Sequence, residues 1–168
     1  MDQNDLVKYS GLNEPNKEFS FDEVGMTWQV SFVRYVSAPI CVFKSIEDFF
    51  ICLIKYGNNM TTSYIGKPEW IETVNLIDWV EHLKIEKIPC EKFVDELDDA
   101  FRELDEEEHN WEESERIDRT IVKTPNDKIL QCWKVEETDF LRNPVGATWS
   151  FIAQSNTDFF YLERHWES

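Results

Sequence analysis

The sequence is poor in glycine, in proline and in basic residues. Its 168 residues include 5 Gly, 6 Pro and 17 Lys+Arg, against 34 Asp+Glu. This composition leaves no glycine-rich loop to hold phosphates and no proline-rich linker between domains. The net charge of −17 at pH 7 predicts repulsion from nucleic acid and from anionic lipid, since both carry dense negative charge.

Catalytic and metal-binding motifs are also missing. The chain contains no P-loop, dinucleotide fingerprint, HExxH, GxSxG or EF-hand spacing. Its four cysteines lie far apart, without a CxxC pair, which is typical of free, buried thiols in a reducing cytoplasm. His109 lies among glutamates, but nothing in this spacing fixes a metal geometry. We therefore expect no enzymatic activity, no cofactor and no bound metal.

Long apolar runs are absent as well. The longest lies around Phe49–Ile54 and is flanked by charge, whereas a membrane-spanning helix needs about 20 apolar residues. The N-terminal MDQNDLVKYSGLNEPNK carries acidic residues where a secretory signal needs a basic flank and an apolar stretch. We expect a cytoplasmic protein that binds neither membranes nor nucleic acid.

Aromatic residues, by contrast, are abundant. They make up 14% of the chain, and hydrophobic residues make up 42%, which argues against global disorder despite the high charge. A chain of this length is most simply one domain with a sizeable core. We expect a single domain over residues 1–168, in which the polar residues 1–18 form a loosely ordered lead-in.

Period-two patterns of apolar residues predict a sheet. The last two predicted strands are apolar on both faces, which is typical of central strands covered on each side. Ile129, Trp133 and Val135 are expected on one face of their strand. The predicted strands are 27–36, a short one at Ile40–Phe43, 120–123, 128–136, and a hairpin of 146–154 and 158–166 around residues 155–157.

Three segments show helical patterns. The first runs over 45–56 with Ser45 as N-cap, the second over 76–83, and the third over 91–106 after Pro89. A strand, then helices, then four strands is the order of an α+β protein with a mainly antiparallel sheet. We expect about three helices, one of them strongly acidic.

The third helix opens the most charged run of the chain, Glu91–Asp118. This run holds fourteen acidic and three basic residues. At 3.6 residues per turn, Phe93, Leu97, Ala100, Phe101 and Leu104 share one face, and Asp95, Asp98, Asp99, Glu103, Asp105 and Glu106 lie opposite. Glu107 and Glu108 would return to the apolar face, so the helix should end near Glu106. Residues 107–117 are then expected to form an acidic loop that carries Trp111.

Such a charge run is often only a solvated face that keeps a protein soluble. Here the excess is one-sided, because few basic residues stand at helical spacing to balance it. An aromatic residue among carboxylates also suits docking to a basic, partly apolar surface. The predicted partner-binding residues are Asp95, Asp98, Asp99, Asp105, Glu106, Glu108, Trp111, Glu112 and Glu113.

In size, acidity, reduced cysteines, α+β pattern and lack of catalytic motifs, the chain resembles bacterial immunity proteins. These include the proteins that neutralise contact-dependent growth-inhibition toxins. The resemblance is one of overall profile across the whole chain. It implies a cytoplasmic antitoxin that covers the active site of a basic toxin domain, in many cases a nuclease, with an acidic surface in place of the phosphate backbone.

Other functions fit the same sequence. A nucleic-acid mimic that blocks a DNA-binding protein would use the same charge. A small enzyme could assemble a site from distant residues, such as His165 with Glu163, or Cys132 with a carboxylate. An adaptor protein would need no charged partner. Within the inhibitor hypothesis, the interface could instead lie on the aromatic C-terminal hairpin around Phe159, Tyr161 and Trp166.

Overall fold

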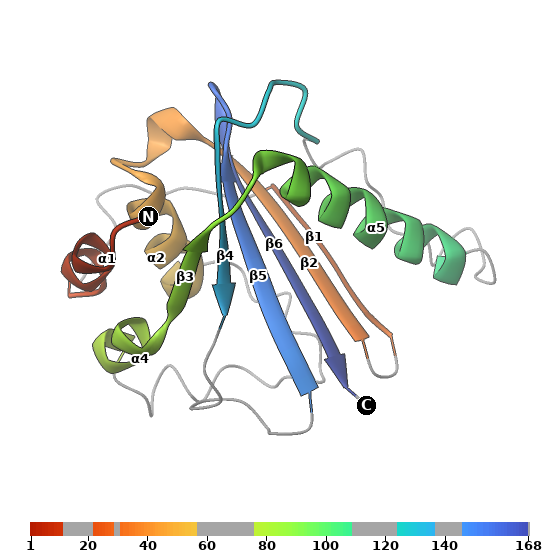
Figure 1. Cartoon of the computed structure of the whole chain (residues 1–168), viewed down its shortest axis with the longest axis horizontal. Helices are drawn as coiled ribbons and strands as arrows, with labels where there is room; N and C mark the ends of the chain where they lie inside the picture. The colour runs from red at the N-terminus through yellow and green to blue at the C-terminus, as the bar shows by residue number, and fades with distance from the viewer. Residues whose placement is uncertain (12–21, 29–30, 57–75, 109–123, 137–145, 168) are drawn as a thin grey trace.

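A computed structural model describes residues 1–11, 22–28, 31–56, 76–108, 124–136 and 146–167. Its centre is an antiparallel sheet of six strands in the order β1-β2-β6-β5-β4-β3 (Figure 1). The fold is therefore α+β with an antiparallel sheet, as the sequence predicts. The strands are β1 (Asp22–Trp28), β2 (Ser31–Pro39), β3 (Lys84–Lys87), β4 (Gln131–Glu136), β5 (Gly146–Gln154) and β6 (Asp158–Glu167).

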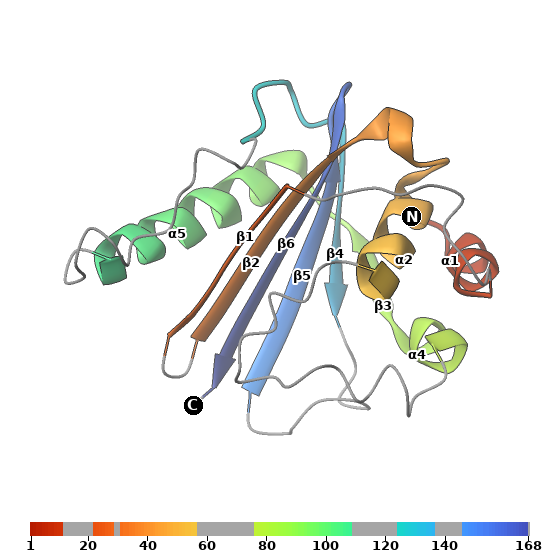
Figure 2. The same ribbon diagram turned by 180° about the vertical axis from the view of Figure 1, so that it is seen from behind.

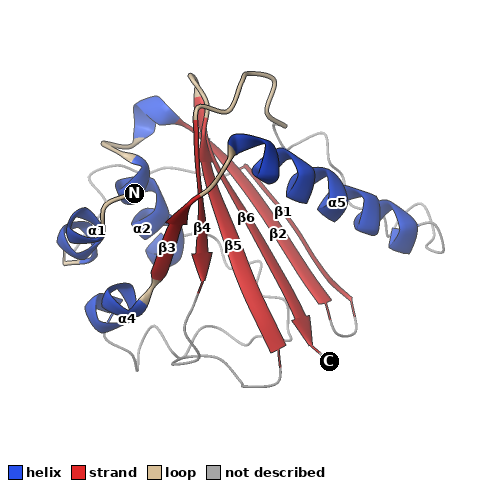
Figure 3. Ribbon diagram, in the orientation of Figure 1, coloured by secondary structure: helices blue, strands red, loops and turns tan. Residues whose placement is uncertain are grey.

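Helices cover both faces of this sheet. One face carries α1 (Gln3–Ser10), α2 (Ile46–Tyr56) and α4 (Leu76–His82), and the other carries α5 (Cys90–Glu108) (Figures 1, 2 and 3). Each face has its own hydrophobic cluster: Phe159 and Tyr161 of β6 pack in the first, and Phe160 and Leu162 in the second. Neighbouring residues of one strand thus enter opposite cores, because side chains alternate across a sheet.

The C-terminal hairpin agrees with its prediction. β5 and β6 have the predicted starts, and they lie in the middle of the sheet with buried residues on both faces. Ser155 closes the turn: its backbone N–H donates to the Asp158 carbonyl at 2.9 Å, and its Oγ accepts from the Asp158 N–H at 3.1 Å. Two-sided burial explains why these strands lack the polar alternation of a half-exposed sheet.

Helix α2 also forms where its sequence predicts. The Asp48 N–H donates to Ser45 Oγ at 3.2 Å, so Ser45 caps the first turn. Phe49 is fully buried, and its ring stacks on Phe159 with 5.3 Å between the centroids. This helix is the main cover of the first core.

The predicted strand at 27–36 is wrong in its extent. β1 ends at Trp28 and β2 begins at Ser31, and these two residues are paired in an antiparallel register. The chain therefore forms a hairpin there. Alternation continues through both strands, and the two residues between them, Gln29 and Val30, are not typical turn formers. The sequence pattern of residues 27–36 is consequently typical of one continuous strand.

The lead-in predicted at residues 1–18 is wrong for its first part. α1 begins after Asp2, whose side chain accepts from the Asn4 N–H at 2.8 Å and from the Asp5 N–H at 3.2 Å. Leu6 is fully buried in the first core. One apolar side chain in a polar stretch is a weak local signal, but it anchors the whole helix.

Three smaller predictions are also corrected. The segment predicted as a short strand at Ile40–Phe43 is a 3-10 turn over Ile40–Val42. Strand β3 was not predicted, because Lys84–Lys87 is largely charged and exposed. Ile129 packs in the second core, whereas Trp133 and Val135 pack in the first. β4 begins only at Gln131, so period two does not extend back to Ile129.

Two predictions remain, one about a further strand and one about membrane-spanning helices. The predicted strand at 120–123 lies outside the described residues. In the part of the chain that the structure describes, no helix has the length and apolar character needed to cross a bilayer.

The acidic helix and the groove beside it

Helix α5 is held on the sheet by the apolar stripe that the sequence predicts. Phe93 and Ala100 are fully buried and Leu97 is nearly so. Phe101 is partly buried, and its ring meets Tyr35 of β2 edge-to-face with 5.6 Å between centroids. The side chain of Leu104 is not among those described. The helix runs to Glu108, two residues beyond the end predicted from the pattern.

A second set of contacts secures the start of α5. The Ile88 N–H, just before the helix, donates to the Cys132 carbonyl of β4 at 3.1 Å. The Lys92 N–H donates to the Pro89 carbonyl at 3.1 Å, which closes the first turn. The N-terminal end of the helix is therefore tied directly to the sheet.

Arg164 of β6 clamps one flank of the helix. Its Nη1 donates to Glu96 Oε2 at 2.9 Å, and its Nη2 lies 2.6 Å from both carboxylate oxygens of Glu103. The Arg164 side chain is only 14% exposed. Sequence reasoning placed Glu103 among the outward residues, because the pairing arginine lies 61 residues away in the chain.

The remaining acidic residues define the outer face of α5. Asp95, Asp98, Asp105 and Glu106 are exposed, and Asp99 forms an ion pair with Arg102 at 2.7 Å. The side chain of Glu108 is not described, and the predicted contacts Trp111, Glu112 and Glu113 lie outside the described residues. The helix contains ten acidic and two basic residues. The outer face of α5 is therefore strongly negative, and the packing of the helix on the sheet holds it in place.

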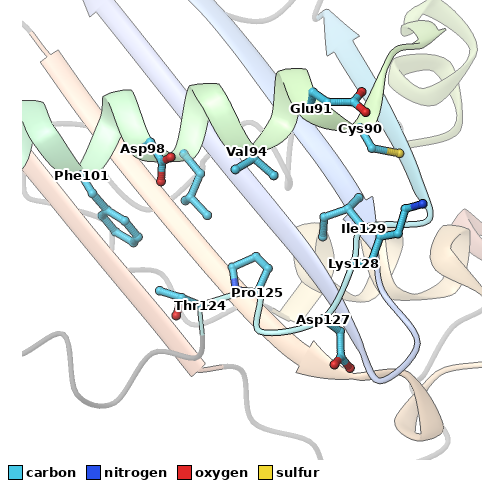
Figure 4. Close-up of a pocket in the computed structure, with 11 residues that line it drawn as sticks. Cys90, Glu91, Val94, Asp98, Phe101, Thr124, Pro125, Asp127, Lys128 and Ile129 are labelled. Carbon is cyan, nitrogen blue, oxygen red and sulfur yellow. The ribbon is translucent and has the colours of Figure 1, made fainter.

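A groove lies along another flank of α5, between the helix and residues 124–129 (Figure 4). Its volume is about 320 Å³. Val94, Leu97 and Phe101 line it from the helix, and Pro125 and Ile129 line it from the facing segment. Four of the other lining residues, Glu91, Asp98, Asp127 and Lys128, are charged. Sequence reasoning missed this groove, because its walls come from two segments that the fold brings together.

The aromatic C-terminal hairpin is not a surface for docking at Phe159 and Tyr161. These residues are 3% and 1% exposed, and both pack in the first core. The side chain of Trp166 is not described. The alternative interface around these residues is therefore wrong for the two that the structure describes.

Of the proposed acid–base pair His165 and Glu163, the structure describes the side chain of Glu163, which is internal. Glu163 is 3% exposed and accepts a hydrogen bond from the Tyr161 hydroxyl at 3.1 Å. The same hydroxyl lies 3.1 Å from Ser150 Oγ. His165 shares that sheet face by its place in β6, but its side chain is not described. His82 is exposed, and its Nδ1 lies 2.6 Å from the Asp78 carbonyl oxygen.

Cysteine chemistry follows burial. All four cysteines are thiols that form no disulfide; Cys52 and Cys132 are buried, Cys90 is partly buried and Cys41 is exposed. Burial raises the pKa of the Cys132 thiol to about 12, so it is protonated at neutral pH and is a poor nucleophile. Within the described residues, no group of three or more His, Cys, Asp or Glu side chains is arranged to hold a metal ion.

Comparisons with family models, with curated proteins and with solved structures found no match to this chain.

Proposed function

We propose that this protein is a non-enzymatic, cytoplasmic inhibitor of the immunity type, which neutralises a cationic toxin domain, most simply a nuclease, with the outer face of α5. One observation carries the proposal. The most acidic segment of the chain forms a 19-residue helix whose apolar stripe and Arg164 clamp fix it to the sheet. Its exposed carboxylates are consequently held in place before any partner arrives.

The physical advantage of such a surface is in the encounter with the partner. Clustered charge of one sign attracts an oppositely charged protein over distances of about the screening length, near 8 Å at physiological salt. This attraction raises the association rate and orients the two surfaces. A nuclease carries positive charge where it binds phosphates, so a row of carboxylates can occupy the same region.

The test is a charge reversal with a matched control. Asp95, Asp98 and Glu106 are exposed on α5 and are changed together to Lys. The control changes Asp5, Asp78 and Glu81 to Lys, because these exposed residues belong to α1 and α4, which cover the opposite face of the sheet from α5 (Figure 1), and give the same change in net charge. The proposal requires a toxin-domain gene immediately upstream of the gene for this chain, and the product of that gene is the partner used in the assay.

Association rates are measured at low and at physiological salt. We expect the α5 variant to associate about tenfold or more slowly at low salt, with a weaker salt dependence, because steering acts on the encounter. The control should lose much less. Equal losses in both variants would show that only the net charge matters, and unchanged rates would reduce α5 to a solvated face. Inhibition of unrelated DNA-binding proteins would favour a nucleic-acid mimic instead.

A further inference from the structure

The groove beside α5 has an apolar interior that is open to solvent. Val94 is 41% exposed, although the other apolar side chains described on α5 are largely covered. In Figure 4, Val94 projects from the helix into the space facing Pro125 and Ile129. Exposed apolar surface in a concavity is typical of a place where a partner side chain is received.

Both walls of the groove are fixed before binding. Leu97 at the helix side is 3% exposed, and Ile129 at the facing side is 4% exposed, so both are anchored in the second core. The Leu130 N–H donates to the Gln154 carbonyl at 2.8 Å, and Asp127 Oδ2 accepts from Thr157 Oγ1 at 3.0 Å. A pocket with fixed walls costs little free energy to order when a ligand enters.

The charges around the groove select the sign of what enters it. Glu91, Val94 and Asp98 follow at helical spacing on the same flank of α5, so a carboxylate stands on each side of the exposed valine. Among the four charged lining residues, three are acidic and one, Lys128, is basic. The outer face of α5 adds more carboxylates beside them. An anionic ligand is therefore disfavoured, and a cationic one is favoured.

The size of the groove limits the occupant further. A volume of about 320 Å³ is at the lower end of the range for small-molecule sites, roughly 300–1,000 Å³. It suits one or two apolar side chains. Basic residues on either side of such an anchor would reach Glu91 and Asp98.

We infer that this groove is an anchor site for a basic peptide segment, which inserts an apolar side chain between flanking lysines or arginines. The inference rests on the proposed function, because the segment would belong to the cationic partner. It adds short-range affinity to the long-range attraction of the outer face. The apolar anchor lowers the dissociation rate, whereas the carboxylates raise the association rate.

The test uses three synthetic hexapeptides as probes. Their binding is detected by NMR, from shifts in the methyl signals of Val94, Leu97 and Ile129. The first is Lys-Lys-Leu-Leu-Lys-Lys, the second replaces both leucines by serine, and the third replaces all lysines by glutamate. We expect only the first peptide to shift the groove methyls. The serine peptide should perturb residues of the outer face alone, and the glutamate peptide should perturb neither.

Matched variants test the apolar contact. Val94→Gln should weaken binding of the leucine peptide about fivefold, as expected for losing part of one buried valine contact. The control is Leu130→Gln, because Leu130 is 46% exposed but does not line the groove. It should change the dissociation constant of the leucine peptide by less than about twofold.

The outcomes separate this inference from the proposed function. If both basic peptides perturb the outer face but the groove methyls do not shift, the groove inference is wrong and the acidic face remains supported. If neither basic peptide binds, both are wrong. Equal binding of the glutamate peptide would refute charge selection, and equal shifts by hexylamine alone would assign the groove to small organic cations and overturn the peptide inference.

Discussion

Two ionisable residues of the second core, Cys132 and Tyr35, stay uncharged near neutral pH because they are buried. Cys132 is fully buried in the second core, and burial raises its thiol pKa to about 12. Tyr35 is also fully buried, and burial raises its pKa well above the ordinary value. Neither group gains a charge near neutral pH, and each serves as packing for α5.

Thiol reactivity gives a residue-scale prediction. In the native protein at pH 7.5, a disulfide reagent such as DTNB should modify Cys41 rapidly and Cys90 more slowly, because Cys41 is exposed and Cys90 is partly buried. Cys132 should react only on unfolding, because it is fully buried and burial raises the pKa of its thiol. The Cys41→Ser variant is the control and should lose the fast phase. A fast phase that survives in this variant would mean that Cys90 or one of the buried cysteines reacts rapidly, against the order expected from exposure.

Helix α5 combines four surfaces in one element. One face packs on the sheet, one flank is paired with Arg164, and the outer face and groove flank are left for solvent or a partner. Clustered acidic residues destabilise an isolated helix through repulsion between neighbouring turns. The clamp offsets part of this repulsion at Glu96 and Glu103, and it also fixes the position of the outer carboxylates.

The clamp gives the element-scale prediction. Arg164→Gln should lower the free energy of unfolding by about 1–2 kcal/mol, because it removes charge-assisted hydrogen bonds from a mostly buried side chain and leaves two carboxylates unpaired. Arg102→Gln is the control on the same helix: its pair with Asp99 is 63% and 47% exposed, and such pairs contribute about 0–1 kcal/mol. Urea denaturation followed by circular dichroism measures both. Similar losses in the two variants would show that the clamp is an ordinary surface pair.

For the whole molecule, the dominant electrostatic term is self-repulsion. The net charge is −17 at pH 7, and folding brings these charges closer together than they are in the expanded unfolded chain. Repulsion is therefore larger in the folded state, and screening it favours folding. The fold tolerates this cost because two hydrophobic cores, one on each face of the sheet, supply the cohesion.

Salt dependence gives the prediction at this scale. Between about 0.01 M and 0.15 M salt the screening length falls from about 30 Å to about 8 Å, and the free energy of unfolding should rise by about 1 kcal/mol. The variant with Asp95, Asp98 and Glu106 changed to Lys should respond less, because its net charge falls from −17 to −11 with two units gained at each position. A wild-type protein that loses stability as salt is added would show that attractive pairs outweigh repulsion.

Local sequence patterns were enough to predict those elements whose burial leaves a regular period within one segment of the chain. The period of α2, the buried stripe of α5 and the doubly apolar strands β5 and β6 could be read from the sequence, because burial imposes a period of 3.6 on helices and of two on strands. The same logic gave the acidic outer face of α5, since its residues follow from the position of the stripe.

Only the tertiary structure decided the features that join distant segments. Arg164 lies 61 residues from Glu103 and 68 from Glu96, and the groove joins α5 to residues 124–129. The Trp28–Ser31 reversal and the burial of Leu6 depend on strand pairing and on packing against α2 and α4. Contacts of this kind are set by the global packing of the two cores, and a periodic pattern in one segment carries no information about which other segment will face it.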